Sequence, residues 1–166
     1  MTSNRTAPCD GLLRAAPLML AMVCAMATVA CEAEPTAPSG PSITIRNNRV
    51  TLAITSTPAE QIKGLGQLDS LPWGHGMLFE YAAPRFPGFW MKDMRFDIDI
   101  IWLREGRIVD ISHRVPHAKD GPGPTLRPSE LTDTVLEVPA GYAQANGWRV
   151  GDRAELDRAD APTIPR

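Results

Sequence analysis

The sequence predicts an all-β domain, built as an antiparallel sandwich or a partly open barrel, with one or two short helices. Short runs of β-branched and aromatic residues recur along the chain, and each is bounded by residues that favour turns. The 13 glycines and 16 prolines are scattered without a period, which indicates many turns and not a repetitive or low-complexity chain. A chain of 166 residues has room for one domain of ordinary size.

A hairpin is expected at the start of the domain. Apolar and polar residues alternate in two runs within 42–54, which is typical of strands with one buried face. Asn47 and Asn48 separate the two runs, and asparagine tolerates the positive φ of a two-residue hairpin turn.

A helix of about two turns is expected to follow the hairpin. Thr57 can cap its first turn, and Glu60, three residues later, completes the pattern of a capping box. Pro58 suits the first helical position, and Gly64 can end the helix.

Five further strands are expected where β-branched and aromatic residues are concentrated: 76–81, 89–91, 97–103, 108–115 and 134–138. A second short helix is expected over 141–147 and a last strand over 154–156. Four prolines and two glycines in 116–128 indicate a long surface loop, which we expect to cover a binding site.

The strand around residue 99 has two different faces. Period-two alternation gives it one face for a core, formed by Phe96, Ile98, Ile100 and Trp102. Asp97 and Asp99 share the opposite face with Ile101, about 6.6 Å apart by strand rise. Two carboxylates at this spacing repel each other when both are ionised, so nearby cations are expected.

The sequence before the domain is typical of an export signal. The first 14 residues contain two arginines, Arg5 and Arg14, and residues 15–30 form an uncharged apolar run. This run is shorter than the roughly 20 residues of a membrane-spanning helix, and a proline-rich segment follows it directly. We therefore expect a signal peptide over 1–30.

Cys31 is the expected point of attachment to a membrane. The small residues Val29 and Ala30 before it resemble the box of bacterial lipoproteins, in which the cysteine is acylated. Thr28 stands where that box usually has leucine, so secretion as a soluble protein is the alternative. The expected organisation is a proline-rich linker over 31–41, the domain over 42–157 and a flexible tail over 158–166.

Cysteine usage and charge narrow the chemistry further. The three cysteines, Cys9, Cys24 and Cys31, all precede the predicted domain, which is therefore free of disulfides and thiol chemistry. The formal net charge of −2 gives no basic field for DNA or RNA, so no nucleic-acid partner is expected.

Several short motifs stand in the order and spacing of a known family. They are Gly76-Met77-Leu78-Phe79, Phe89-Trp90-Met91-Lys92-Asp93-Met94, Asp99-Ile100-Ile101, Leu136-Glu137-Val138 with Gly141, and Gly151-Asp152. From about Val50 to Leu156 the chain resembles the bacterial and archaeal family called domain of unknown function 192. The resemblance implies a compact all-β domain with a small helix or two, often exported or behind a membrane anchor, and implies no established reaction.

The chain departs from the pattern of that family at three places. Where the family commonly has Asn-Thr after Phe-Trp-Met-Lys, this chain has Asp93 and Met94. The Pro-Leu pair that precedes the family's aspartate is replaced by Asp97-Ile98. The family's Gly-Leu-Met segment, with an arginine soon after it, appears in this chain as Gly64-Leu65-Gly66-Gln67-Leu68. If those family residues build a polar site, this member has an altered one.

Five residues of the resembling segment are the candidates for ligand binding: Trp90, Met91, Lys92, Asp99 and Glu137. Trp90 and Met91 can form an apolar platform or belong to the core. Strand alternation places Lys92 on the side of Trp90, at the rim of a pocket or inside it, where a lysine binds anions or carboxylates. Asp99 and Glu137 can serve as acid and base, or hydrogen-bond backbone amides in a structural role.

These observations favour an exported, envelope-associated or periplasmic module that binds a small ligand, such as a saccharide or envelope fragment, without catalysis. One alternative is a glycan- or ester-cleaving hydrolase that uses Asp99 and Glu137. Another is a structural assembly partner, which would expose an apolar patch. No cofactor is expected, and no metal, because His113 and His117 stand in a strand and a loop without a ligand signature.

Overall fold

The computed structural model describes residues 40–55, 57–66, 68–118, 121 and 123–158. The predicted signal peptide 1–30, the linker up to residue 39 with Cys31, and the tail beyond residue 158 lie outside the described residues. Neither helix in the described part is long and apolar enough to cross a membrane.

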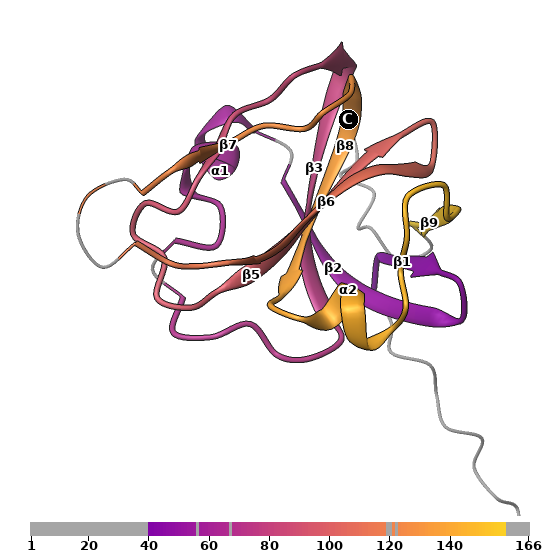
Figure 1. The fold of residues 1–166 in the computed structure, drawn as a ribbon, viewed down its shortest axis with the longest axis horizontal. Coiled ribbons are helices and arrows are strands. Elements are labelled where there is room, and N and C mark those ends of the chain that lie inside the picture. The colour runs from indigo at the N-terminus through magenta and orange to yellow at the C-terminus, as the bar shows by residue number, and fades with distance from the viewer. Residues whose placement is uncertain (1–39, 56, 67, 119–120, 122, 159–166) are drawn as a thin grey trace, which may run out of the picture. The chain divides into compact units, whose positions relative to one another are not determined.

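The domain is a strongly curled, seven-stranded mixed sheet in the form of a half-barrel, with a separate two-stranded sheet and two short helices (Figure 1). The elements are β1 (Ser42–Ile45), β2 (Asn48–Thr55), α1 (Pro58–Lys63), β3 (His75–Arg85), β4 (Phe89–Trp90), β5 (Ile98–Arg104), β6 (Arg107–Val115), β7 (Thr125–Leu126), β8 (Thr132–Pro139), α2 (Tyr142–Ala145) and β9 (Ala154–Asp157). The strand order of the large sheet is β6-β5-β8-β3-β2-β1-β9, and β4 pairs with β7. The predicted all-β class with two short helices is therefore confirmed.

The strand pairing is antiparallel with one exception. β2 and β3 run parallel, with Leu52 opposite Gly76 and Ile54 opposite Leu78. Parallel neighbours need a crossover connection, and residues 56–74 with α1 supply it. The helix α1 is part of this crossover. Its first turn is closed by the capping box of Thr57 and Glu60, with Pro58 at its start.

The close packing around Gly76 explains why the motif Gly76-Met77-Leu78-Phe79 begins with a glycine. A Cβ atom at this position would lie 2.8 Å from the carbonyl oxygen of Glu137 and 2.9 Å from Cδ1 of Leu136. The residue is buried where β3 packs between β2 and β8, and only a glycine permits this approach.

The two outer strands of the large sheet, β6 and β9, meet at one point. Arg107 and Arg153 form an isolated antiparallel bridge, the Ile108 amide donates to the Asp152 carbonyl at 3.0 Å, and the Gly151 amide donates to the Ile108 carbonyl at 2.8 Å. The half-barrel is therefore partly closed, as the sequence predicts.

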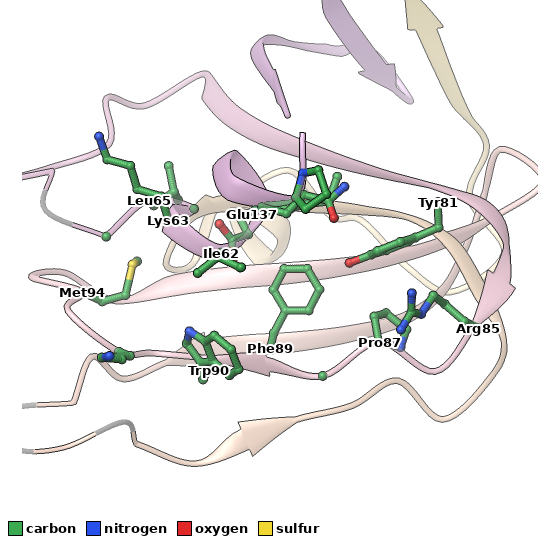
Figure 2. A pocket seen from close by; sticks show the side chains of 17 residues that line it. Ile62, Lys63, Leu65, Tyr81, Arg85, Pro87, Phe89, Trp90, Met94 and Glu137 are labelled. Carbon is green, nitrogen blue, oxygen red and sulfur yellow. The ribbon is translucent and has the colours of Figure 1, made fainter. Parts of the chain in front are cut away.

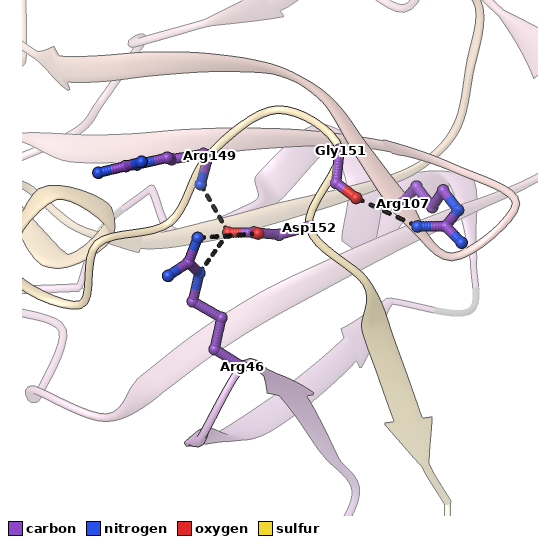
Figure 3. Close-up of polar contacts among 5 residues, drawn as sticks. All are labelled: Arg46, Arg107, Arg149, Gly151 and Asp152. Atoms are coloured by element: carbon purple, nitrogen blue, oxygen red, sulfur yellow. Dashed lines mark hydrogen bonds and ion pairs between the residues drawn. The ribbon is translucent and has the colours of Figure 1, made fainter.

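Asp152 connects the segment between α2 and β9 to the turn of the first hairpin (Figure 3). Its carboxylate accepts hydrogen bonds from Nε of Arg46 at 2.7 Å, from Nη2 of Arg46 at 3.1 Å and from the Arg149 amide at 2.8 Å. The bond from Arg46 is the main reason that the pKa of Asp152 lies below its ordinary value. The Gly151-Asp152 motif therefore has a structural role, because it holds the segment before β9 against the turn that follows β1.

Two details of the predicted elements are corrected. Ile45 pairs with Asn48, so the hairpin turn is formed by Arg46 and Asn47 and not by the two asparagines. Arg46 adopts a φ of +55°, an unusual conformation that its bonds to Asp152 help to hold. The proline-rich segment 116–128, which is expected to be a loop, also contains the two-residue strand β7.

Both faces of the large sheet are buried, and each carries its own core. The first core lies on the face of the sheet that α2 covers. Among its buried residues are Ile45, Val50, Leu78, Ile101, Leu103, Leu136, Val138 and Trp148. The second core lies on the side of β4, and its buried residues include Leu65, Phe79, Met91, Met94, Ile98, Ile100, Trp102 and Val135. The predicted alternation along β5 is thus confirmed, but the face expected to be polar is buried as well.

Candidate functional site

A cavity of about 260 Å³ opens on the side of the second core, next to Glu137 (Figure 2). One wall comes from α1 and the residues that follow it, within 58–66. The opposite walls come from β3 and from the segment 87–94, which contains β4. The cavity is therefore bounded by the crossover helix and the small sheet and has one strand residue of β8 at its side.

Glu137 is the acidic residue of this cavity. In the strand register it stands between Met77 of β3 and Ile100 of β5, and it is only 6% exposed. Its Oε2 atom is buried without a hydrogen-bond partner among the described residues. Burial raises the pKa of Glu137 to about 8, because the charged form loses its hydration. At neutral pH the side chain is mainly a neutral acid that can donate a hydrogen bond into the cavity.

Tyr81 shares the cavity with Glu137. Burial is the main cause of the raised pKa of the Tyr81 phenol; the charge of Arg85 opposes this rise, and the charge of Glu137 adds to it. The Arg85 guanidinium lies 5.3 Å from the centre of the Tyr81 ring, in cation–π geometry. Figure 2 shows Tyr81 and Arg85 toward one end of the cavity, and Lys63 and Met94 toward the other.

Trp90 forms part of the wall and remains 49% exposed. β4 is held in place by its pairing with β7, with Trp90 opposite Thr125. Its neighbour Phe89 packs edge-on against Phe79 at 5.0 Å and against Trp102 at 5.4 Å. A half-exposed indole is thus fixed on a short, well-packed strand and offers an apolar surface to a ligand.

Lys92 is exposed and also lines the cavity. Two further cations, Lys63 and Arg85, line it as well. None of the three forms an ion pair with a described residue of the chain. The cavity therefore combines a buried, mainly neutral acid with three cationic groups that water can reach.

Met91 lies elsewhere. It is 1% exposed and belongs to the second core, and it does not line the cavity. Its position next to Trp90 in the chain follows the alternation of a strand, with one residue turned to the core and the next toward solvent. The structure places Met91 as a packing residue.

Asp99 is fully buried and does not line the cavity either. Its Oδ1 accepts hydrogen bonds from the amides of Arg114 at 2.7 Å and Gly141 at 3.0 Å, and its Oδ2 accepts one from the Ala143 amide at 2.9 Å. Gly141 has a φ of +84°, and Arg114 has a φ of +48°. Asp99 thus organises the start of α2 and the end of β6.

The structure does not bring together the carboxylates of the hydrolase alternative. In the pairing of β5 with β8, Asp99 stands opposite Val138, and Ile100 stands opposite Glu137. Adjacent register positions point to opposite faces of a sheet, so Asp99 lies on the side of the first core and Glu137 on the side of the second. These two groups cannot flank one bond of a bound substrate.

The proline-rich loop does not cover the cavity as expected. None of the described residues of 116–128 lines it, and β7 instead pairs with β4. At the beginning of the loop, His117 donates its backbone amide to Asp97 at 2.9 Å, and its Nδ1 lies 2.7 Å from the same carboxylate oxygen. The cavity is covered from the other side, by α1.

Sequence reasoning missed Lys63, Tyr81 and Arg85. Tyr81 had a weak signal, because it follows Phe79 by two residues and so shares its strand face. Lys63 had none, because its place at the cavity depends on the path of the crossover between β2 and β3.

The departures from the family pattern have local explanations. Asp93 has a φ of +60°, a left-handed conformation that asparagine and aspartate both tolerate, so this replacement preserves the turn. Met94 is 8% exposed and lines the cavity, where it supplies apolar bulk in place of the family's threonine. Leu68 is 43% exposed and lies outside the cavity wall.

Metal-binding groups do not gather in the described part of the chain, which contains no cluster of three or more His, Cys, Asp or Glu side chains suited to an ion. His113 is exposed on β6, and His117 is engaged by Asp97.

The comparisons with known proteins agree with this architecture. Residues 42–156 match the family of domain of unknown function 192, which is described as an uncharacterized ACR. A comparison with curated proteins found no match.

Two solved structures are similar to this chain. One, from Sinorhizobium meliloti 1021 and provisionally described as a transcription regulator, is 25% identical with a TM-score of 0.64, and the match covers 74% of this chain and 98% of that one. The other, a protein of unknown function from Novosphingobium aromaticivorans DSM 12444, is 27% identical with a TM-score of 0.63, and covers 70% and 83%.

Proposed function

Because the chain belongs to the family of domain of unknown function 192, and the matched region 42–156 contains the whole cavity, we propose that the cavity is a binding site for a small ligand, in particular a saccharide. The domain binds this ligand without converting it. This role fits an accessory module of the cell envelope.

The Oε2 atom of Glu137, which has no hydrogen-bond partner among the described residues, carries the proposal. A buried polar atom without a hydrogen bond costs about 1–3 kcal/mol, and such atoms are rare in folded proteins. A ligand hydroxyl at this position would satisfy the carboxyl group in either protonation state, because a hydroxyl both donates and accepts.

The half-exposed Trp90 supports a saccharide as the ligand class. The faces of sugar rings carry C–H groups that pack on an indole, while their hydroxyls reach polar side chains. The cavity offers both features, with Trp90 and Phe89 on one wall and Glu137 and Tyr81 beside them. Its volume of about 260 Å³ suits a ligand of one sugar ring, at the small end of ligand pockets.

Binding without catalysis is favoured by the number of carboxylic acids. Glu137 is the only acidic residue among the described residues that line this cavity. Cleavage of a glycosidic bond by the usual mechanism needs two carboxyl groups on either side of the bond. Asp99, the second group of the hydrolase alternative, is engaged by three amides on the other face of the sheet.

We place the module outside the cytoplasm, attached to a membrane by an acylated Cys31 and a linker of about ten residues. The support is the signal-like sequence of 1–30 and the cysteine that directly follows it. Mass spectrometry of the protein purified from its host tests this localisation: a diacylglyceryl group on an N-terminal Cys31 supports the anchor, and an unmodified N-terminus at another residue contradicts it.

Ligand-observed NMR and isothermal titration calorimetry with a panel of neutral and acidic monosaccharides test the binding role. Trp90→Ala and Glu137→Leu, which removes the polar group of the carboxyl side chain, are each expected to weaken the binding of a ligand at least about tenfold, which corresponds to about 1.4 kcal/mol. Trp73→Ala is the matched control, because Trp73 is 59% exposed but does not line the cavity. Binding that is unchanged in both cavity variants, with circular dichroism showing a folded protein, contradicts the proposal.

A further inference from the structure

A second cavity of about 240 Å³ adjoins the first. The two share much of their lining, namely Ile62, Lys63, Gly66, Trp90 and Lys92. The second cavity adds Ala59 and Asp93. Two lysines and the indole of Trp90 therefore form a wall that faces both spaces, and a ligand extending from one cavity into the other passes them.

The charges on this common wall are unbalanced. Lys63 and Lys92 are exposed, and neither has an ion-pair partner in the part of the chain that the structure describes. Asp93 lines the second cavity and forms an ion pair with neither lysine. One carboxylate against two ammonium groups leaves a local excess of positive charge, and Arg85 at the far end of the first cavity adds to it.

A neutral ligand would leave both lysines in contact with water only. An anionic group placed between them would gain charge-assisted hydrogen bonds, which are about twice as strong as those between neutral groups. The apolar residues around the lysines, Ile62 and Trp90, lower the local polarity and strengthen such a contact.

We propose that the ligand is an acidic saccharide, whose ring packs on Trp90 and whose carboxylate or phosphate group is held by Lys63 and Lys92, an inference that rests on the proposed function. The sugar hydroxyls occupy the inner cavity beside Glu137, and the anionic group occupies the space shared with the second cavity.

The state of Glu137 is compatible with an anionic ligand. An ionised carboxylate at the inner end of the cavity would repel such a ligand, but burial raises the pKa of Glu137 to about 8. Near neutral pH its side chain is mainly uncharged and donates a hydrogen bond to a sugar oxygen.

Calorimetric titrations with matched sugars test the inference. Each of three pairs differs in an acidic group: glucuronate and glucose, galacturonate and galactose, and N-acetylmuramic acid and N-acetylglucosamine. Glucose 6-phosphate and galactose 6-phosphate distinguish a phosphate from a carboxylate as the preferred group. The acidic member of at least one set is expected to bind about tenfold more tightly than its neutral partner, and this advantage shrinks at high salt.

Variants assign the preference to the two lysines. Lys63→Gln with Lys92→Gln is expected to remove the advantage of the acidic sugar, so that it binds no more tightly than its neutral partner. Arg153→Gln, which removes an exposed cation just before β9 and outside both cavities, is the control and is expected to retain the advantage.

Each result is decisive. Equal affinity of acidic and neutral sugars, or an advantage that survives in the double lysine variant, overturns the inference and leaves the proposed function in place. The absence of binding by all eight sugars overturns both.

Discussion

Asp99 and Glu137 lie on opposite faces of the sheet, although their strands β5 and β8 are neighbours. Asp99 gives both of its oxygens to backbone amides, whereas Oε2 of Glu137 has no partner among the described residues. One carboxylate thus serves the fold, and the other is available to a ligand.

Asp99→Ala is expected to lower the free energy of unfolding by about 3 kcal/mol or more. The variant leaves the buried amides of Gly141 and Ala143 and the part-buried amide of Arg114 without their acceptor, and each buried loss costs about 1–3 kcal/mol. Urea denaturation measures the change. Asp97→Ala, which removes an exposed partner of His117, is the control and should cost about 1 kcal/mol or less. Similar losses in the two variants would contradict the structural role of Asp99.

Glu137 is expected to make stability depend on pH. Its pKa is raised from 4.5 to about 8 in the folded protein, so the folded state binds more protons than the unfolded state between these values. The free energy of unfolding should therefore fall as the pH rises from about 4.5 to about 8 and level off above that. Glu137→Gln, which cannot ionise, should flatten this part of the profile and be more stable than the parent at pH 8 by about 1–3 kcal/mol. Parallel profiles of the variant and the parent would show that Glu137 is not a buried acid.

Met91 and Trp90 are expected to behave in opposite ways, although they are adjacent in the chain. Met91→Ala removes a core side chain and should lower the free energy of unfolding by about 2–5 kcal/mol, with little change in ligand affinity for the folded protein. Trp90→Ala should cost less stability, because Trp90 is half exposed, and should weaken binding. Urea denaturation and calorimetry on both variants measure the contrast. A large loss of affinity in Met91→Ala with native stability would refute this division.

Asp152 is expected to add stability above its folded pKa. Because the bond from Arg46 lowers this pKa, the contribution is present above the ordinary value of 3.8 and disappears as the pH falls through the lower, folded value. Asp152→Asn should lower the melting temperature at pH 7 and have little effect in strong acid. Asp133→Asn is the control, because Asp133 accepts bonds from the Glu105 amide and the Thr134 hydroxyl but forms no ion pair with a described residue. A loss of stability in Asp152→Asn that does not depend on pH would contradict the charge-based role.

Local patterns predicted the fold well. The capping box of Thr57 and Glu60 predicted α1, and the alternation from Ile98 to Trp102 predicted how β5 divides its side chains between two faces. These features depend on neighbours within a few residues of each other. The parallel pairing of β2 with β3 had no such signal, because it follows from the path of a long crossover.

The site was predictable only in part, because its composition also depends on how distant segments of the chain pair and pack. Trp90, Lys92 and Glu137, which the resemblance singled out, do line one cavity. That Asp99 would face the other core depends on the register between β5 and β8, which a single sequence does not specify. The contribution of Lys63 and Arg85 depends on the tertiary positions of α1 and the end of β3.

A crystal structure with an acidic sugar bound tests the central claim most directly, through the distance from Oε2 of Glu137 to the nearest ligand oxygen. The account predicts a hydrogen bond of about 2.5–3.0 Å, with the sugar ring against Trp90. A sugar bound at another surface, or one in the cavity that leaves Oε2 of Glu137 without a partner, would contradict it.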